Sequence, residues 1–598
     1  MPENISASKL SRFREAMAGL GLQAYIVPSQ DPHQSEYVAP HWQTRSWLTG
    51  FTGSAGTAVV TDSHAGLWTD SRYFLQAEQE LTGSGFSLEK LKVPHTPEYL
   101  SWLAGHLPAG SRIGADSRLL SLGQARAMRR FFEPHGLELA FEDGLVDKIW
   151  AGRPPLPKEP ARLLAEDLAG QPAREKLDAI RQQMGGVDYY LVTALDEIAW
   201  ALNIRGQDVD YNPVVISYLV IGQRSAHWFV DPGKVDATVE AGLSKSDVSV
   251  HPYEELAGWL LELEGKARVG YDAGGLTAFL YGLLPAEQWA SLGSLVAPLK
   301  AIRNPAERAN LKKAMRKDGV ALLRLARWLE HTLAEGEEVT EFEVGQKLTA
   351  FRAAQPGYQG DSFGAIVGYQ GNGAIVHYSA KAETAAAIRP EGVLLLDSGG
   401  QYLEGTTDIT RTFALGPVSG EVKDRYTRVL KGYIGLARAV FPEGTTGVQL
   451  DILARQHLWA AGLNYGHGTG HGVGHFLNVH EGPQSITPNP RSPKGQQPIQ
   501  EGMLQSNEPG YYEPGAFGIR IENLELCVLR QEGSHGRFLG FEPQTLFPIA
   551  TDLVDREMLA PEEVAWLNEY HARVFQELAP LLNEEEQHWL KLACRPLA

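Results

Sequence analysis

The sequence predicts a multidomain protein in which two α/β domains precede a larger α+β domain. Three observations predict this fold class. The chain has 598 residues, which is more than one hydrophobic core usually holds. Short apolar strands alternate with helices in residues 1–153, and the same order restarts after a proline-rich stretch. From residue 363 onward the pattern changes to strands and turns that carry acidic residues and histidines.

The first domain is expected to span residues 1–153. Its apolar runs are typical of short buried strands, and helical segments separate them. The expected strands are residues 24–29, 56–61, 66–70 and 112–116, and the expected helices are 71–81 and 123–132. This alternation is typical of a layered α/β domain. Several prolines in Ala151–Leu164 break regular structure and mark the boundary.

A polar cluster follows the first expected strand. Its members are Asp31, His33, Glu36, His41 and Trp42. A ligand or a partner subunit is one interpretation of such a cluster. Its spacing is irregular for metal ligands, so we expect a loop whose polar groups satisfy one another.

The second domain is expected to span residues 154–304 and to repeat the pattern of the first. Its helix and strand order suggests a distant duplication. The expected elements are helices at 174–184 and 196–202, and strands at 189–193, 214–222 and 227–231. A third domain, residues 305–598, then opens with a long helix through Leu329. Thr340 and Glu343 have the spacing of a capping box for a second helix that reaches Ala354.

The composition excludes several classes of function. Apolar residues make up 43% and charged residues 21%, as in an ordinary globular protein. A net charge of −18 argues against a nucleic-acid partner and against an anionic membrane surface. The two cysteines cannot form a disulfide framework, and no stretch has the ~18 apolar residues of a membrane span. Since the first residues lack the apolar core of a signal peptide, we expect a cytoplasmic protein.

Two aspartates lie on an expected hairpin in residues 393–415. Asp397 ends the apolar run Val-Leu-Leu-Leu, and the strand after a glycine-rich turn places Asp408 on one face with Thr410. The hairpin returns Asp408 to the vicinity of Asp397. Two such carboxylates would repel each other, and a divalent cation relieves that repulsion. Two ordinary turn aspartates are the alternative for this hairpin alone.

The stretch Gly466–Pro483, GHGTGHGVGHFLNVHEGP, concentrates histidine and glycine. It is a poor helix and a poor core strand, which favours a functional loop over a structural one. It contains four histidines, His467, His471, His475 and His480. A glycine-rich loop with incidental histidines is the alternative for this stretch alone.

Two glutamates complete the candidate set. Glu508 precedes a Pro-Gly turn, and Glu522 lies in the run Gly518–Val528, which predicts one alternating strand. Arg520 shares a face with Glu522, and charged groups on an apolar face need partners. Carboxylates with one imidazole suit Mn, Co, Fe or Zn. Four carboxylate charges are neutralised by two divalent ions, the arrangement of hydrolytic two-metal sites.

These residues resemble the pita-bread metallopeptidases, the superfamily of methionine aminopeptidase, prolidase and aminopeptidase P. The family's ligand order of Asp, Asp, His, Glu and Glu is met by Asp397, Asp408, His471, Glu508 and Glu522. Within the superfamily, the chain is most similar to the large, three-domain cytosolic form of Xaa-Pro aminopeptidase. Its motifs are found in all three parts, as GFTGSAGTAVVT, IAWALNIRGQDVDYNP and HGTGHGVGHFLNVHEGP. The resemblance implies two creatinase N-terminal-like domains followed by a pita-bread catalytic domain.

The resemblance also implies an activity and a role for each site residue. The chain would remove an N-terminal residue that precedes proline, using two divalent ions, foremost Mn(II), with Zn(II) or Co(II) as alternatives. Asp408 and Glu522 would bridge both ions, Asp397 would hold one, and His471 and Glu508 would hold the other. The implied catalytic residues are His377, His467, His480 and Glu508, and the implied substrate-binding residues are Tyr512 and Arg520.

Other expectations concern His475, the tail and rival functions. His475 departs from the serine that eukaryotic members carry there; it either tunes the site or faces solvent, and we favour solvent. The C-terminal helix from Ala560, with Trp566 and Trp589, carries more apolar surface than one helix needs against its own domain. The resemblance implies that such surface helps form a homodimer, which we expect here. Prolidase, a non-catalytic binding protein and a metal-free creatinase-like hydrolase are the rivals. The length argues against the first, and the complete ligand set argues against the other two.

Overall fold

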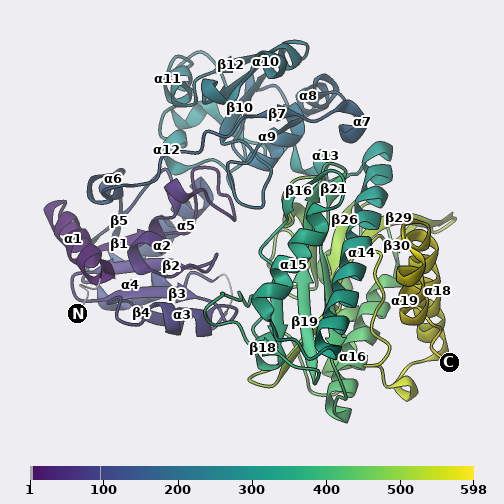
Figure 1. Ribbon diagram of the computed structural model, residues 1–598. Coiled ribbons are helices and arrows are strands. Elements are labelled where there is room, and N and C mark those ends of the chain that lie inside the picture. The colour runs from purple at the N-terminus through teal and green to yellow at the C-terminus, as the bar shows by residue number, and fades with distance from the viewer. Residues whose placement is uncertain (1–4, 94–95) are drawn as a thin grey trace. The chain divides into compact units, whose positions relative to one another are not determined.

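The computed structural model describes residues 5–93 and 96–598 and divides the chain into two compact units. The first unit comprises Met1–Leu164 with Gln171–Val296, and the second comprises Ala165–Gly170 with Ala297–Ala598 (Figure 1). The first unit holds the strands expected for both α/β domains, whereas residues 165–170 and 297–304 of the second expected domain belong to the second unit. The short helix α7 (Glu166–Ala169) belongs to the second unit.

The first sheet has the strand order β4-β3-β2-β1-β5-β6. Here β2 is antiparallel to both β1 and β3, while β1 is parallel to β5. The expected strands are confirmed within a few residues at their ends. The strands are β1 (Ala24–Val27), β2 (Thr57–Thr61), β3 (Ala65–Thr69), β4 (Ser87–Lys90), β5 (Arg112–Ala115) and β6 (Glu138–Phe141). The helices are α1 (Ile5–Gly19), α2 (Thr44–Thr49), α3 (Phe74–Glu80), α4 (Glu98–His106), α5 (Leu122–Phe132) and α6 (Leu145–Ile149).

The second sheet repeats that topology with the order β12-β11-β10-β8-β13-β14. Again one strand, β10, is antiparallel to both neighbours, and β8 is parallel to β13. The expected duplication is thus confirmed in the strand order. The strands are β8 (Tyr189–Val192), β10 (Ser217–Gly222), β11 (Ala226–Val230), β12 (Val248–His251), β13 (Val269–Tyr271) and β14 (Trp289–Ser291). The helices are α8 (Ala173–Arg181), α9 (Leu195–Leu202), α10 (Ala237–Ser244), α11 (Leu256–Leu261) and α12 (Ala278–Tyr281).

The polar cluster after β1 is a hydrogen-bonded loop, but the expectation that its polar groups are all satisfied is met only in part, because the buried Asp31 Oδ2 and Trp42 Nε1 have no hydrogen-bond partner among the described residues. Asp31 and His33 are buried, and Asp31 Oδ1 accepts hydrogen bonds from the backbone N–H of His33 and of Ser35, each at 2.9 Å. His33 Nδ1 donates to the carbonyl of Thr193 at 2.8 Å, and its Nε2 lies 3.0 Å from the hydroxyl of Tyr253. The loop therefore joins the two α/β halves of the first unit.

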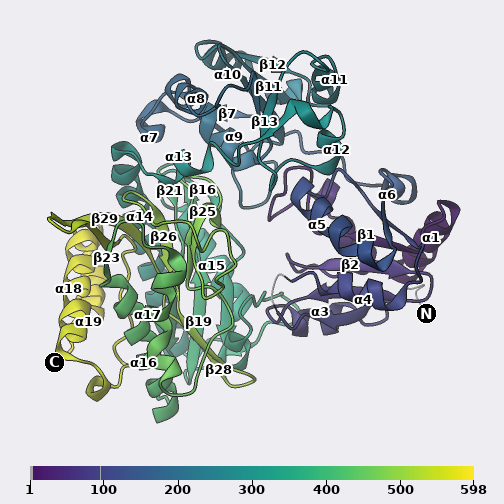
Figure 2. The same ribbon diagram turned by 180° about the vertical axis from the view of Figure 1, so that it is seen from behind.

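In the second unit, two helix pairs flank the strands that carry the candidate site. α14 (Pro305–Ala334) and α15 (Glu341–Ala353) face the viewer in Figure 1, while α16 (Gly420–Ala437) and α17 (Gly447–Trp459) face the viewer in Figure 2. Asn304 and Glu307 form a capping box for α14, and Thr340 and Glu343 form one for α15. Both helices therefore begin where side chains satisfy their first N–H groups.

The candidate site lies on two of this unit's sheets, a three-stranded sheet, β17-β19-β22, and a six-stranded sheet, β23-β30-β29-β26-β24-β25. The three-stranded sheet comprises β17 (Ile366–Tyr369), β19 (Val393–Ser398) and β22 (Ile409–Ala414). The six-stranded sheet comprises β23 (Val440–Pro442), β24 (Gly470–Gly472), β25 (Glu481–Ile486), β26 (Leu504–Asn507), β29 (Asn523–Gly533) and β30 (Gly536–Pro543). The β27 (Gly510–Glu513) and β28 (Phe517–Arg520) strands pair with each other.

One strand prediction was wrong. The run Gly518–Val528 was expected to be continuous, but the chain leaves β28 after Arg520 and enters β29 at Asn523. The two strands have different partners, since β28 pairs with β27 and β29 pairs with β26 and β30. Glu522 lies at the break between them, so its backbone belongs to neither ladder.

The C-terminal tail forms α18 (Pro561–Leu578) and α19 (Glu584–Ala593), side by side against α14 (Figure 1). The expected apolar face of α18 is confirmed as buried in the core of its own unit, at Val564, Leu567, Val574 and Leu578. Much of the surface that suggested a homodimer is thus already covered within the chain. No helix of the described residues is long and apolar enough to cross a membrane.

Candidate metal centre

The two aspartates lie together at one end of the β19–β22 hairpin. Asp397 is the penultimate residue of β19, and its Cα partner across the ladder is Thr410 of β22. Asp408 immediately precedes β22, so the strand begins slightly later than the sequence suggests. Both side chains are buried. Asp397 Oδ2 accepts a hydrogen bond from Arg520 Nη2 at 2.6 Å, while its buried Oδ1 has no hydrogen-bond partner among the described residues.

His471 points its Nε2 atom at two carboxylates. The Nε2 lies 3.5 Å from Asp408 Oδ2 and 3.5 Å from Glu508 Oε1. Its Nδ1 lies 3.0 Å from the carbonyl oxygen of Gly472, a contact in which only the ring nitrogen can donate. This bond fixes the tautomer whose Nε2 lone pair points toward the carboxylates, which is how histidines that bind metals are commonly oriented.

Glu522 is held from both sides by Thr410. The Thr410 hydroxyl donates to Glu522 Oε2 at 2.8 Å, and the backbone N–H of Glu522 donates to the carbonyl of Thr410 at 3.1 Å. The same hydroxyl accepts from Arg520 Nε at 3.1 Å. The sequence placed Thr410 on the face of Asp408 without assigning it a role, and it is a site residue that sequence reasoning missed.

A hydrogen-bonded chain of three residues borders the carboxylates. Arg520 Nη1 donates to the hydroxyl of Tyr512 at 2.6 Å, and that hydroxyl donates to His467 Nε2 at 2.8 Å. His467 Nδ1 donates in turn to the carbonyl of Gly468 at 2.7 Å. The guanidinium of Arg520 is buried, so its charge is balanced by Asp397 at its other end.

Burial and mutual repulsion change the protonation of these groups. The pKa of Asp408 is raised well above its ordinary value by burial and then by the charges of Asp397 and Glu508. Burial likewise raises the pKa of Glu522, with repulsion from Asp408 as the next cause, and burial raises that of Glu508 to about 7. The pKa of Tyr512 is raised to about 12, chiefly by burial. The positive charge that the protein itself places near these carboxyls is therefore too small to keep all of them ionised at neutral pH.

The donor set fits divalent metal ions. Ligand atoms of Asp408, His471 and Glu522 all lie within 4.8 Å of one another. The buried Oδ1 of Asp397 and the raised pKa values of the carboxyls are features that a cation at this place would relieve. Carboxylate oxygens with one imidazole are typical ligands of Mn, Co, Fe and Zn.

The remaining histidines occupy different environments. The ring of His480 lies edge-on to that of His471, with centroids 4.3 Å apart. His377 is half-buried in the segment after Ala374, and its catalytic role stays a prediction. The preference for a solvent-facing His475 was wrong. His475 is buried, and its Nε2 donates to the carbonyl of Leu168 at 3.1 Å, because α7 packs over this loop.

Most of the chain matches known protein families. Residues 309–528 match metallopeptidase family M24, and residues 537–597 match its C-terminal region. Residues 9–149 and 152–307 each match a creatinase/prolidase N-terminal domain. Aminopeptidase P2 of Arabidopsis thaliana is 40% identical, covering 99% of this chain and 88% of its own length. The chain belongs to the Xaa-Pro aminopeptidase family.

Solved structures of relatives agree with this family membership. The X-prolyl aminopeptidase of Caenorhabditis elegans, described as a cytosolic enzyme with a di-nuclear active site, matches with a TM-score of 0.94 and 36% identity. The match covers 99% of this chain and 100% of that one. An Xaa-Pro dipeptidase from Bacillus anthracis is 26% identical with a TM-score of 0.50, and it covers 63% of this chain and 98% of its own. The expected fold, with creatinase-type N-terminal domains before a pita-bread domain, is therefore confirmed for this member of the Xaa-Pro aminopeptidase family.

Proposed function

We propose that the protein is a two-metal Xaa-Pro aminopeptidase that releases the N-terminal residue preceding proline. The observation that carries the proposal is that ligand atoms of Asp408, His471 and Glu522 lie within 4.8 Å of one another. The full-length similarity to Xaa-Pro aminopeptidases supports the same activity.

Five residues hold the ions in this proposal. Asp408 and Glu522 would offer ligand atoms to both divalent ions, Asp397 to one of them, and His471 and Glu508 to the other. The ions, when bound, supply Lewis acidity and an activated water to the scissile peptide bond. Mn(II) is the proposed metal, with Zn(II) and Co(II) as alternatives, because oxygen ligands dominate the set.

The other residues bind and orient the peptide or move its protons. Glu508 accepts a proton from the attacking water in this proposal. His480 donates a hydrogen bond to the oxygen that becomes negatively charged, while His467 and His377 contact the substrate around the scissile bond. Tyr512 and Arg520 line the place that receives the prolyl residue. A bond to proline has no N–H, so a pocket shaped for its ring carries the specificity.

A peptide cleavage assay tests this proposal. The protein is stripped of metal, reconstituted with Mn(II) or Zn(II), and incubated with Arg-Pro-Pro and with Xaa-Pro dipeptides. Release of free arginine from the tripeptide is expected. Cleavage confined to dipeptides would identify a prolidase, and inactivity of the metal-loaded protein on every Xaa-Pro peptide would favour a binding protein.

Three further properties belong to the proposal. The domains span residues 1–153, 154–304 and 305–598, and the protein works in the cytoplasm, where the relative from Caenorhabditis elegans is also described. It forms a homodimer, for which the half-buried Trp566 and Trp589 of the tail offer apolar surface. Sedimentation at micromolar concentration tests the dimer, and a monomer there would contradict it.

A further inference from the structure

Arg411 connects the metal centre to the C-terminal part of the chain. It lies on β22 next to Thr410, and its side chain is fully inside the protein, at 2% exposure. Successive side chains of a strand point to opposite faces. Arg411 therefore leaves the strand on the face opposite to Thr410, away from Glu522 Oε2.

The guanidinium binds the backbone around Glu522. Its Nη1 donates to the carbonyl of Glu522 at 2.6 Å and to that of Thr410 at 2.9 Å, while Nη2 donates to Asn523 Oδ1 at 2.8 Å. Since Glu522 lies at the break between β28 and β29, its carbonyl has no place in either ladder. Arg411 satisfies that carbonyl, which would otherwise be costly to bury.

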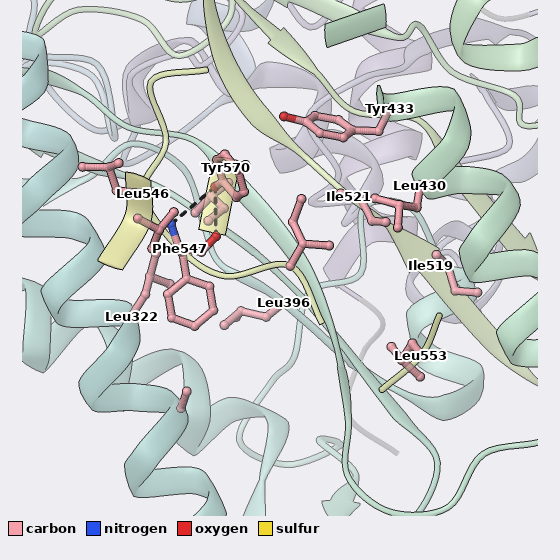
Figure 3. Close-up of a cluster of buried hydrophobic side chains, with 14 of the residues drawn as sticks. Leu322, Leu396, Leu430, Tyr433, Ile519, Ile521, Leu546, Phe547, Leu553 and Tyr570 are labelled. Atoms are coloured by element: carbon pink, nitrogen blue, oxygen red, sulfur yellow. Dashed lines mark hydrogen bonds between the residues drawn. The ribbon is translucent and has the colours of Figure 1, made fainter. Parts of the chain in front are cut away.

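The other donors of Arg411 reach the C-terminal region. Nε donates to the carbonyl of Pro548 at 2.9 Å, and Nη2 donates to that of Phe547 at 2.7 Å. Nη2 also lies 3.0 Å from the hydroxyl of Tyr570 on α18, which itself donates to the carbonyl of Phe547 at 2.9 Å. In Figure 3 a dashed hydrogen bond joins Tyr570 to Phe547 within the buried cluster.

Two independent connections thus converge on Glu522. On the face of β22 that carries the metal centre, Thr410 fixes the carboxylate of Glu522 through one hydrogen bond. From the side of the tail, Arg411 and Tyr570 fix its main chain. A carboxylate shared by two ions must be placed accurately, because outer-shell partners orient the ligands of a metal.

We propose that Arg411 and Tyr570 are positioning residues for the metal centre, so that helix α18 sets the position of Glu522 and with it the affinity for the ions. This inference rests on the proposed metal role of Glu522. It gives the C-terminal region, residues 537–597, a part in metal binding although none of its residues is among the proposed ligands.

The test is Tyr570→Phe, which removes one oxygen and keeps the buried ring. Manganese binding to the metal-free full chain is measured by electron paramagnetic resonance of free Mn(II). We expect the weaker of the two dissociation constants to rise about tenfold, as for other outer-shell changes. Arg411→Lys is expected to raise it further, and the double variant to bind no more weakly than Arg411→Lys, because both act through the same contact.

The matched control is Tyr426→Phe. Tyr426 is a buried tyrosine of α16 in the same core, and its hydroxyl makes no hydrogen bond to Arg411 or to any other described residue. We expect it to bind manganese as the wild type does. Equal manganese binding by Tyr570→Phe and wild type, or an equal loss in Tyr426→Phe, would overturn the inference alone. Wild-type protein that neither binds manganese nor cleaves Xaa-Pro peptides would overturn the proposed function, and the inference with it.

Discussion

Gly470 lies so close to the carbonyl of Ser506 that a Cβ on Gly470 would sit 2.0 Å from that oxygen. The two residues belong to β24 and β26, which carry His471 and lead to Glu508. The Ser506 hydroxyl accepts from the backbone N–H of His471 at 3.0 Å. A glycine is therefore needed here so that the two strands can bring their ligands together.

Replacing this glycine should separate the two ligands. In Gly470→Ala the methyl group must push β24 away from β26, so we expect manganese affinity to fall at least about tenfold. Gly466→Ala in the same loop is the control, because a Cβ there meets nothing within 4 Å. Isothermal titration with Mn(II) compares the two. If both variants bind as tightly as wild type, the close contact does not govern ligand placement.

Asp408→Asn should abolish activity and yet stabilise the metal-free protein. The amide weakens a bridging ligand, so at most one ion should bind, and kcat should fall by more than about a thousandfold. Without ions, folding must protonate Asp408 near neutral pH because its pKa is raised, and Asn avoids that cost, so thermal unfolding of the metal-free chain should occur at a higher temperature. Asp424→Asn on α16, whose carboxylate pairs with Arg425 and Arg428, serves as the control for activity. Near-normal activity of Asp408→Asn would contradict the two-metal assignment.

Tyr512→Phe should impair peptide cleavage and leave metal binding unchanged. The hydroxyl of Tyr512 connects Arg520 with His467, and neither bond involves Asp408, Glu522 or His471. Losing these bonds should lower kcat/KM for an Xaa-Pro tripeptide about tenfold. Tyr511→Phe, the adjacent change, removes a hydroxyl that donates to Glu513 instead and should keep normal activity. Equal kcat/KM values for the two variants would contradict a substrate role for Tyr512.

Metal binding should release protons near neutral pH. The pKa of Glu508 is about 7 and those of Asp408 and Glu522 are raised well above normal, so these carboxyls hold protons in the metal-free protein. Ions must displace those protons, and apparent affinity for Mn(II) should therefore rise as the pH increases through 7. Titration calorimetry at pH 6.5 in two buffers of different ionisation enthalpy counts the protons. A heat that is independent of the buffer would rule out this linkage.

The raised pKa of Glu508 also makes the stability of the metal-free protein depend on pH. Because the folded-state pKa of Glu508 lies above its ordinary value of 4.5, its contribution to the stability of the metal-free protein is present below pH 4.5. It is lost as the pH rises through 7. Metal-free protein should consequently gain more thermal stability from Mn(II) at pH 8 than at pH 5.5.

His571 should make the second unit sensitive to acid. Burial lowers its pKa to about 4, and its Nε2 accepts a hydrogen bond from the backbone N–H of Ile549 at 3.1 Å. Its stabilising effect is present above pH 6.5 and is lost as the pH falls toward 4, by about 3 kcal/mol in total. His571→Gln, which keeps an acceptor, should flatten this part of the curve of unfolding free energy against pH. An unchanged slope between pH 6.5 and 4 would exclude His571 as its source.

Local sequence determined a large part of this protein. The capping boxes at Asn304 and Thr340 mark the starts of α14 and α15, and the repeated strand order reveals the duplication of the first unit. The five proposed ligands could be named from residue type and motif. Such features depend on neighbours in the chain, which is why periodicity and turn residues predict them.

Tertiary structure alone decided how the site is held. The hydrogen bond between Thr410 and Glu522 joins residues 112 positions apart, and the burial of His475 depends on α7, 307 positions away along the chain. The break after Arg520 and the contacts of Arg411 also arise from pairing between distant strands. Alternation along one strand tells which face a side chain occupies, but packing between segments decides what it touches there.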